Sequence, residues 1–206
     1  MQTSTELKER AATYRLLAQL YRQELTEPLA RRIVDTEVLD SLARYGYERP
    51  SDFADAQNLS NLKREFTKVF IGPGKHIAPY GSVHHPDDKK KGQLWGETTT
   101  TVRLFAKEHG LSFKGEVYDG MPDHIGHELE LFALLLEGEA EAVSSDEADK
   151  AERLENSQRY LHGQHLSRWI PVFCNKVEQE TDGLYAAIAR LTRDLLGDEA
   201  ERLAEA

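Results

Sequence analysis

Apolar residues return every three or four positions along most of this sequence, and this spacing limits the fold more than any other feature. In the first segment they alternate steps of four and three, at Leu7, Ala11, Tyr14, Ala18, Tyr21 and Leu25. Because an α-helix turns once in 3.6 residues, such steps place the side chains on one stripe. No segment alternates apolar and polar residues over a useful length, as a half-buried strand would. The pattern therefore predicts an all-α protein.

The same spacing predicts further helices, which together form a helical bundle of about seven to nine helices. They cover residues 29–44, 59–71, 94–109, 123–137, 148–162, 166–180 and 184–196. Ser4 or Thr5 is expected to cap the first helix, and Asp123 the helix that follows it. The helix after Asp123 is apolar over much of its circumference, which predicts a central place in the core. The acidic stretch 137–149 is expected to be a solvated turn.

A long break separates the early helices from the later ones. Residues 72–92 contain Gly72, Pro73, Gly74, Pro79, Gly81, Pro86 and Gly92. Glycine and proline at this density interrupt helices, so a long loop is expected to link N- and C-terminal helical parts. We expect one domain over 1–206, with sub-lobes at 1–71 and 93–206. The loop also carries Tyr80 and His84, which a simple spacer would not need.

Charge and composition exclude several classes of protein. The formal net charge of −10 would repel nucleic-acid phosphates, and it would attract a cationic partner. The longest apolar run, residues 131–136, is far shorter than the roughly 20 residues of a membrane span. Cys174 is the single cysteine, so no internal disulfide can form. The polar N-terminal stretch lacks the apolar run of a signal peptide, so we expect a cytoplasmic protein with no nucleic acid bound and no stable membrane insertion.

One group of side chains suggests metal chemistry. Histidine and carboxylate residues stand at spacings of three and four, the spacing that shares a helix face, at His124, His127, Glu128, His162 and His165. The order is His-x-x-His-Glu, which differs from the His-Glu-x-x-His of zinc hydrolases. No nucleophile elbow, phosphate loop or dinucleotide motif is present. A helical metal-dependent hydrolase or oxidase stays an alternative, but we expect no metal, no cofactor and no catalytic residue.

Aromatic residues stand in or beside the loops. Tyr80, Trp95 and Tyr118 lie where the chain is expected to change direction, away from the apolar stripes. Aromatic anchors beside a loop suit a groove that binds a peptide. The other interpretation is that they fasten the loops to the bundle.

Three blocks of sequence, in order, resemble a known family. Residues 65–72 and 78–83 read EFTKVFIG and APYGSV, residues 121–129 read MPDHIGHEL, and residues 165–173 read HLSRWIPVF. They are similar to the E-x-x-x-L-F-x-G … P-Y-x-S-x-Y, L-P-D-H and H-L-x-x-W-x-P-x-F segments of the TorD/DmsD/NarJ family of redox-enzyme maturation chaperones. Pro122 stands where the TorD and DmsD branches often carry glutamate, which leaves the subfamily and the client open.

The resemblance implies a TorD-like helical chaperone rather than an enzyme. Such a protein would bind the twin-arginine signal peptide and the catalytic subunit of a molybdenum oxidoreductase in the cytoplasm until the cofactor is inserted. It would be a monomer or a domain-swapped dimer. An adaptor with another partner is the remaining alternative. The expected client-binding residues are Tyr80, Ser82, Trp95, Asp119, Asp123, His124, Glu128, His165 and Trp169.

Overall fold

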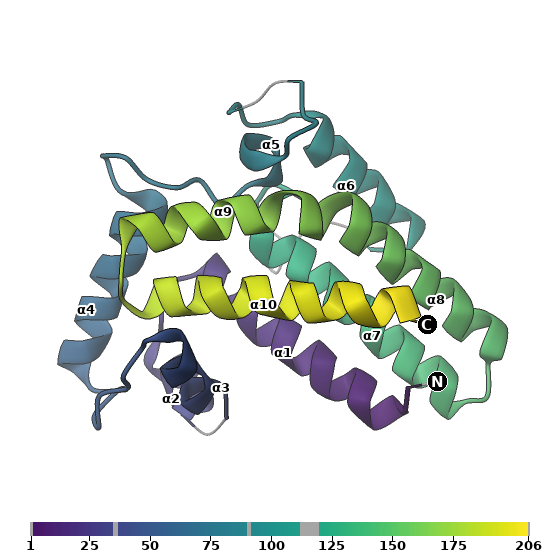
Figure 1. Cartoon of the computed structure of the whole chain (residues 1–206), viewed down its shortest axis with the longest axis horizontal. Helices are drawn as coiled ribbons and strands as arrows, with labels where there is room; N and C mark the ends of the chain where they lie inside the picture. The colour runs from purple at the N-terminus through teal and green to yellow at the C-terminus, as the bar shows by residue number, and fades with distance from the viewer. Residues whose placement is uncertain (1, 35–36, 90–91, 112–119, 206) are drawn as a thin grey trace. The chain divides into compact units, whose positions relative to one another are not determined.

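The structure is a computed structural model that describes residues 2–34, 37–89, 92–111 and 120–205. Its regular elements are helices, and the only β-type pairing within these residues is an isolated bridge between Tyr80 and His124. The expected all-α fold is confirmed. The helices, shown in Figure 1, are α1 (Ser4–Arg22), α2 (Glu27–Val34), α3 (Glu37–Leu42), α4 (Ala56–Phe66), α5 (Gly81–His84), α6 (Glu97–Glu108), α7 (Ile125–Ser144), α8 (Ala148–Leu161), α9 (Ser167–Glu180) and α10 (Leu184–Glu205).

The chain forms two compact units, each built from separate stretches of sequence. The first comprises Met1–Arg22, Pro79–Ile170 and Leu196–Ala206, and the second comprises Gln23–Ala78 and Pro171–Leu195. Both α9 and α10 therefore contribute residues to each unit. This grouping crosses the sub-lobes at 1–71 and 93–206 considered from the sequence, because the apolar stripe of α1 packs on α7.

The core of the first unit is the contact between α1 and α7. Leu7, Ala11 and Tyr14 of the predicted stripe are fully buried, and the ring of Tyr14 lies 4.6 Å from that of Phe132. The expectation that α7 is central is confirmed, since apolar side chains on most of its sides are buried. The solvated turn expected over 137–149 was wrong, because α7 continues to Ser144. Two glutamates in this stretch have partners on other helices: Arg15 pairs with Glu137 at 2.5 Å, and Gln158 donates to Glu139 at 2.6 Å.

The beginning of α7 differs from the prediction in its capping residue. His124 is the N-cap, and its Nδ1 accepts a hydrogen bond of 3.0 Å from the backbone N–H of Gly126. The expectation that Asp123 caps this helix was wrong, because its carboxylate binds a different segment of the chain. Gly126 faces α1 so closely that a Cβ there would lie 2.7 Å from the backbone oxygen of Ala18. The two helices can approach to this distance only because position 126 has no side chain.

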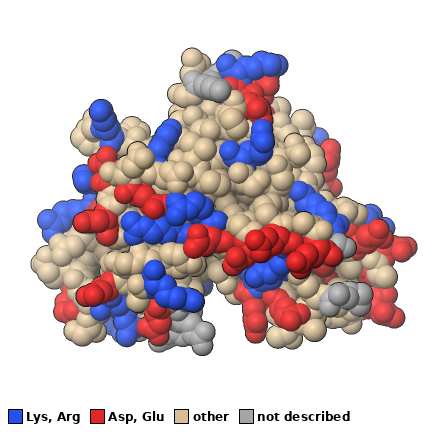
Figure 2. Space-filling view, in the orientation of Figure 1, with Lys and Arg blue, Asp and Glu red and all other residues tan. Residues whose placement is uncertain are grey.

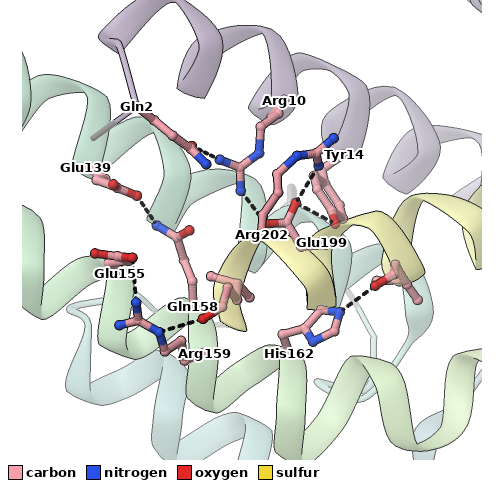
Figure 3. A network of polar contacts seen from close by, with 12 residues as sticks. Gln2, Arg10, Tyr14, Glu139, Glu155, Gln158, Arg159, His162, Glu199 and Arg202 are labelled. Carbon is pink, nitrogen blue, oxygen red and sulfur yellow. Dashed lines mark hydrogen bonds and ion pairs between the residues drawn. The ribbon is translucent and has the colours of Figure 1, made fainter. Parts of the chain in front are cut away.

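A polar network fixes the C-terminal part of α10 within the first unit (Figure 3). Glu199 is fully buried; its carboxylate accepts hydrogen bonds from Arg10 and from the Tyr14 hydroxyl, the latter at 3.2 Å. Two backbone carbonyls of α10 also accept hydrogen bonds. Leu196 O accepts from His162 Nε2, and Leu203 O accepts from Arg159 Nε, both at 2.9 Å. Side chains of α1, of α8 and of the turn directly after α8 thus hold this part of α10 by charged and polar contacts.

In the second unit, Glu65 joins α4 to the beginning of α10. Its carboxylate accepts hydrogen bonds from Thr181 Oγ1 at 3.0 Å and from the backbone N–H groups of Leu184 and Tyr185 at 3.3 and 3.1 Å. Charged acceptors at a helix N-terminus satisfy N–H groups that have no partner inside the helix. The glutamate of the first sequence block therefore has a structural role. Around it lies a cluster of aromatic rings, formed by Phe66, Phe70, Phe173 and Tyr185.

Candidate functional site

The candidate site lies in the first unit, where two loop segments far apart in sequence bind each other. The backbone N–H of Ile125 donates to Pro79 O at 2.9 Å, and the N–H of Gly81 donates to Asp123 O at 2.8 Å. The Asp123 carboxylate accepts a third bond, of 2.8 Å, from the N–H of Ser82. The segments 79–82 and 123–125, which belong to two of the three sequence blocks, thus form one structure, hereafter the loop clamp.

Glu128 and Trp169 form the inner wall of the loop clamp. Both side chains are fully buried, and Trp169 Nε1 donates a long hydrogen bond of 3.4 Å to Glu128 Oε2. A Cβ at Gly81 would lie only 3.1 Å from Glu128 Oε1 and 3.2 Å from Trp169 Nε1. Glycine at position 81 therefore lets the loop pass directly over the carboxylate and the indole. Burial, followed by the nearby charge of Asp123, raises the pKa of Glu128 well above its usual value.

Several buried polar atoms of this site have no hydrogen-bond partner within the described part of the chain. They are Ser82 Oγ, Asp123 Oδ1 and Glu128 Oε1, and His165 Nδ1 belongs to the same class. An unpaired polar group in the interior costs free energy, on the order of 1–3 kcal/mol for a neutral group and more for a charged one. Buried carboxylate oxygens without a bonded donor are therefore set up to receive N–H or O–H donors.

Tyr80 and His124 are the partly exposed members of the site. Their rings lie 5.2 Å apart in an edge-to-face arrangement, and each is half-buried. Burial, with smaller contributions from His127 and Arg22, lowers the pKa of His124 to about 3. His124 is therefore neutral at physiological pH, which its role as an acceptor at the helix N-cap requires. Within the segments 79–82 and 123–125, Tyr80 and His124 are the residues that are not fully buried.

A row of histidines lies beside Trp169. His84 stacks on the Trp169 indole at a ring distance of 6.1 Å, and His85 lies 6.3 Å from His165. Burial, followed by the charge of His85, lowers the pKa of His165 to about 4. His84 was not among the expected site residues. Its place four residues after Tyr80, in a loop where a simple spacer would not need a histidine, was the signal in the sequence that could have identified it.

Comparison with known proteins gives a match over this site. A family model described as nitrate reductase delta subunit matches residues 35–175, which include all three sequence blocks. The chain belongs to the nitrate reductase delta subunit family. This family consists of maturation chaperones for molybdoenzymes and is part of the TorD-like group, so the resemblance found in the sequence is confirmed. A search among curated proteins gave no match.

Not every expected site residue of this delta-subunit chain lies in the loop clamp. The structure brings Tyr80, Ser82, Asp123, His124 and Glu128 together with Trp169, and His165 lies beside them. Asp119 lies outside the described residues. Trp95 is not among the residues that these contacts join; it lies before α6, where it is 64% exposed and its backbone has a φ of 64°. A left-handed backbone is unfavourable for a bulky residue, and such strain persists only where the surroundings impose it.

The histidines considered for a metal site have other contacts in this delta-subunit chain. His127 Nδ1 lies 2.8 Å from Met121 O, and His162 Nε2 bonds Leu196 O in the polar network of α10. Among the described residues no three His, Cys, Asp or Glu side chains are placed to hold a metal ion.

Within residues 2–34, 37–89, 92–111 and 120–205, no helix combines the length and the apolar character of a transmembrane span.

Proposed function

We propose that this chain binds the twin-arginine signal peptide, and with it the immature form, of a molybdopterin-dependent oxidoreductase in the cytoplasm. Binding would delay export until the cofactor is inserted and the client has folded. The chain acts in this proposal as a binding protein without catalytic residues or a cofactor of its own. Membership of a family of molybdoenzyme maturation chaperones supports the proposal.

The observation that carries the proposal is the pair of buried carboxylates in the loop clamp. Asp123 Oδ1 and Glu128 Oε1 have no bonded donor among the described residues, and the partly exposed side chains of Tyr80 and His124 belong to the same loop clamp. An arginine side chain carries five N–H donors in a planar fork that matches carboxylate oxygens. Displacement of the two rings would let a signal-peptide arginine bind Asp123, while Asp123 Oδ2 keeps its bond to Ser82.

The apolar middle of the signal peptide needs apolar surface near this acidic site. Tyr80 offers one half-buried aromatic ring at the clamp, and Trp95 offers an indole that is 64% exposed. The formal net charge of −10 favours approach of the basic end of the peptide.

Removing these aromatic rings should weaken peptide binding. Covering an aromatic side chain contributes on the order of 1.5–3 kcal/mol, so Tyr80→Ala and Trp95→Ala should each lower affinity roughly tenfold to a hundredfold. Calorimetric titration of a synthetic twin-arginine signal peptide into each folded variant measures the change. Tyr47→Ala is a matched control, because it removes another partly exposed ring, one that belongs to the second unit and packs on Phe53. Wild-type affinity in both test variants would remove these residues from the site.

The charge of Asp123 provides the decisive test of the function. Asp123→Asn keeps an oxygen that can accept from the Ser82 N–H, so its melting temperature should stay close to that of the wild type, while affinity for the signal peptide should fall about tenfold or more. Asp123→Ala should also destabilise the fold, by about 1–3 kcal/mol, because the Ser82 N–H loses its partner.

A change in the peptide tests the same contact from the other side. A signal peptide with both arginines replaced by lysine keeps its charge but loses the two-pronged geometry. It should bind the wild type more weakly than the arginine peptide and bind Asp123→Asn with little further loss. Equal affinities of wild-type protein for the two peptides, or wild-type affinity in Asp123→Asn, would contradict the proposed arginine contact.

A further inference from the structure

A second hollow lies in the other unit, beside α4, and the proposed signal-peptide site does not include it. Its volume is about 710 Å³, within the range of roughly 300–1,000 Å³ that is usual for ligand sites. We name it the α4 hollow. Its lining residues come from α4 and from the turn and loop after it, together with two glutamates from other parts of the chain. The charged members are Lys63, Arg64, Lys68, Lys75, Glu24 and Glu180.

Most of the positive charge around the α4 hollow is not neutralised by carboxylates. Within the described part of the chain, the ammonium groups of Lys63 and Lys75 have no ion-pair partner, and Arg64 bonds Ser60 O and the Asn61 amide oxygen. Lys68 Nζ makes two exposed contacts of 3.5 Å with Glu180, one with its carboxylate and one with its backbone oxygen. In Figure 2, Lys and Arg side chains over α4 and the loop after it have Asp and Glu among them, whereas Asp and Glu form a row along the C-terminal part of α10. On a chain of net charge −10, this concentration of cations needs an explanation.

The backbone beside the α4 hollow is also unusual. Residues Thr67–Ile71 form a π-helical turn, and the segment Gly72-Pro73-Gly74 follows it along the rim. Such turns are rare and occur often at functional sites. Ile71 at the end of the turn is 60% exposed. Ile71 directly precedes the lining residue Gly72, so an exposed apolar side chain adjoins the rim along the chain.

We propose that the α4 hollow binds an acidic segment of polypeptide that alternates carboxylate and apolar side chains. A basic twin-arginine peptide would be repelled by Lys63, Lys68 and Lys75. A single small phosphate compound fits less well, because the cations are exposed and spread along the hollow, which matches several carboxylates better than one fixed anion. The hollow therefore recognises a part of the client outside the signal peptide, and in this respect the inference rests on the proposed function.

The test uses a fluorescent twelve-residue peptide of alternating glutamate and leucine, followed by anisotropy on the full chain at low ionic strength. Lys63→Glu/Lys75→Glu should weaken its binding at least tenfold, because two attractive contacts become repulsive. The matched control is Lys8→Glu/Lys107→Glu, which changes the net charge equally at two exposed positions of the first unit. This control should bind as the wild type does, and urea unfolding of both variants verifies that they remain folded.

Two further measurements separate this inference from the proposed function. The twin-arginine peptide is titrated into the same variants, and its affinity should not fall in Lys63→Glu/Lys75→Glu. Pyrophosphate is added as a competitor, and it should displace the acidic peptide only to the extent that sodium chloride of equal ionic strength does. Absence of acidic-peptide binding, equal binding by the two double variants, or displacement by micromolar pyrophosphate would each overturn the inference. None of these results would alter binding of the signal peptide at the loop clamp.

Discussion

Gly126→Ala is expected to destabilise the fold by about 2–3 kcal/mol, although alanine is the better helix former by roughly 1 kcal/mol. The added Cβ would lie 2.3 Å from Arg22 Cγ and 2.7 Å from the backbone oxygen of Ala18. The arginine side chain can move, but the backbone oxygen cannot move without shifting α1. The contact between α1 and α7 carries the core of the first unit, so their separation would loosen rings such as Tyr14 and Phe132.

Urea unfolding followed by circular dichroism measures this effect. Gly197→Ala in α10 is the control, because a Cβ there has no atom within 4 Å. Its midpoint should equal or exceed that of the wild type, as expected for alanine in a helix interior. If Gly126→Ala also unfolded at the wild-type midpoint, the close approach of α1 and α7 at this position would be wrong.

The helices that pack on a core were predictable from the sequence because their periodicity directly reports which side is buried. Leu7, Ala11 and Tyr14 were expected on one stripe, and all three are fully buried. The length of α7 was not predictable in this way. Its last turns contain glutamates that look solvated in a local window, yet Glu139 accepts a bond of 2.6 Å from Gln158 of α8. A partner on another helix leaves no local signal.

The candidate site shows the same limit. Asp123 and His124 both have the chemistry of a cap, and the sequence favoured Asp123. The choice depends on Ser82, whose N–H binds the Asp123 carboxylate from 41 positions away and leaves the cap to His124. The resemblance to the family identified the segments of the loop clamp. It did not predict that the carboxylates of Asp123 and Glu128 would be buried. The left-handed backbone of Trp95 likewise has no signal in the neighbouring sequence.

The largest loss of stability is expected for Glu199→Ala, about 3–5 kcal/mol, because it removes one partner of a buried ion pair. The Glu199 side chain is fully buried, and it binds Arg10, whose side chain is 13% exposed, together with the Tyr14 hydroxyl (Figure 3). Without the carboxylate, the Arg10 guanidinium stays in the interior with its charge uncompensated. Its Nε already lacks a partner among the described residues, so the remaining contacts cannot compensate.

The physical cause can be separated from loss of packing with two further variants. Glu201→Ala removes an exposed glutamate two positions later in α10 and should change the unfolding free energy by less than about 0.5 kcal/mol. The double variant Arg10→Met/Glu199→Leu removes both charges of the Arg10 pair and fills the space with apolar groups. Arg202, which also lies 3.8 Å from the Glu199 carboxylate, is 41% exposed and stays solvated, so the double variant should recover much of the stability lost in Glu199→Ala. Urea midpoints of the four proteins decide the matter. A double variant as unstable as Glu199→Ala would mean that the shape of these side chains, rather than the charge left on Arg10, holds α10 to α1.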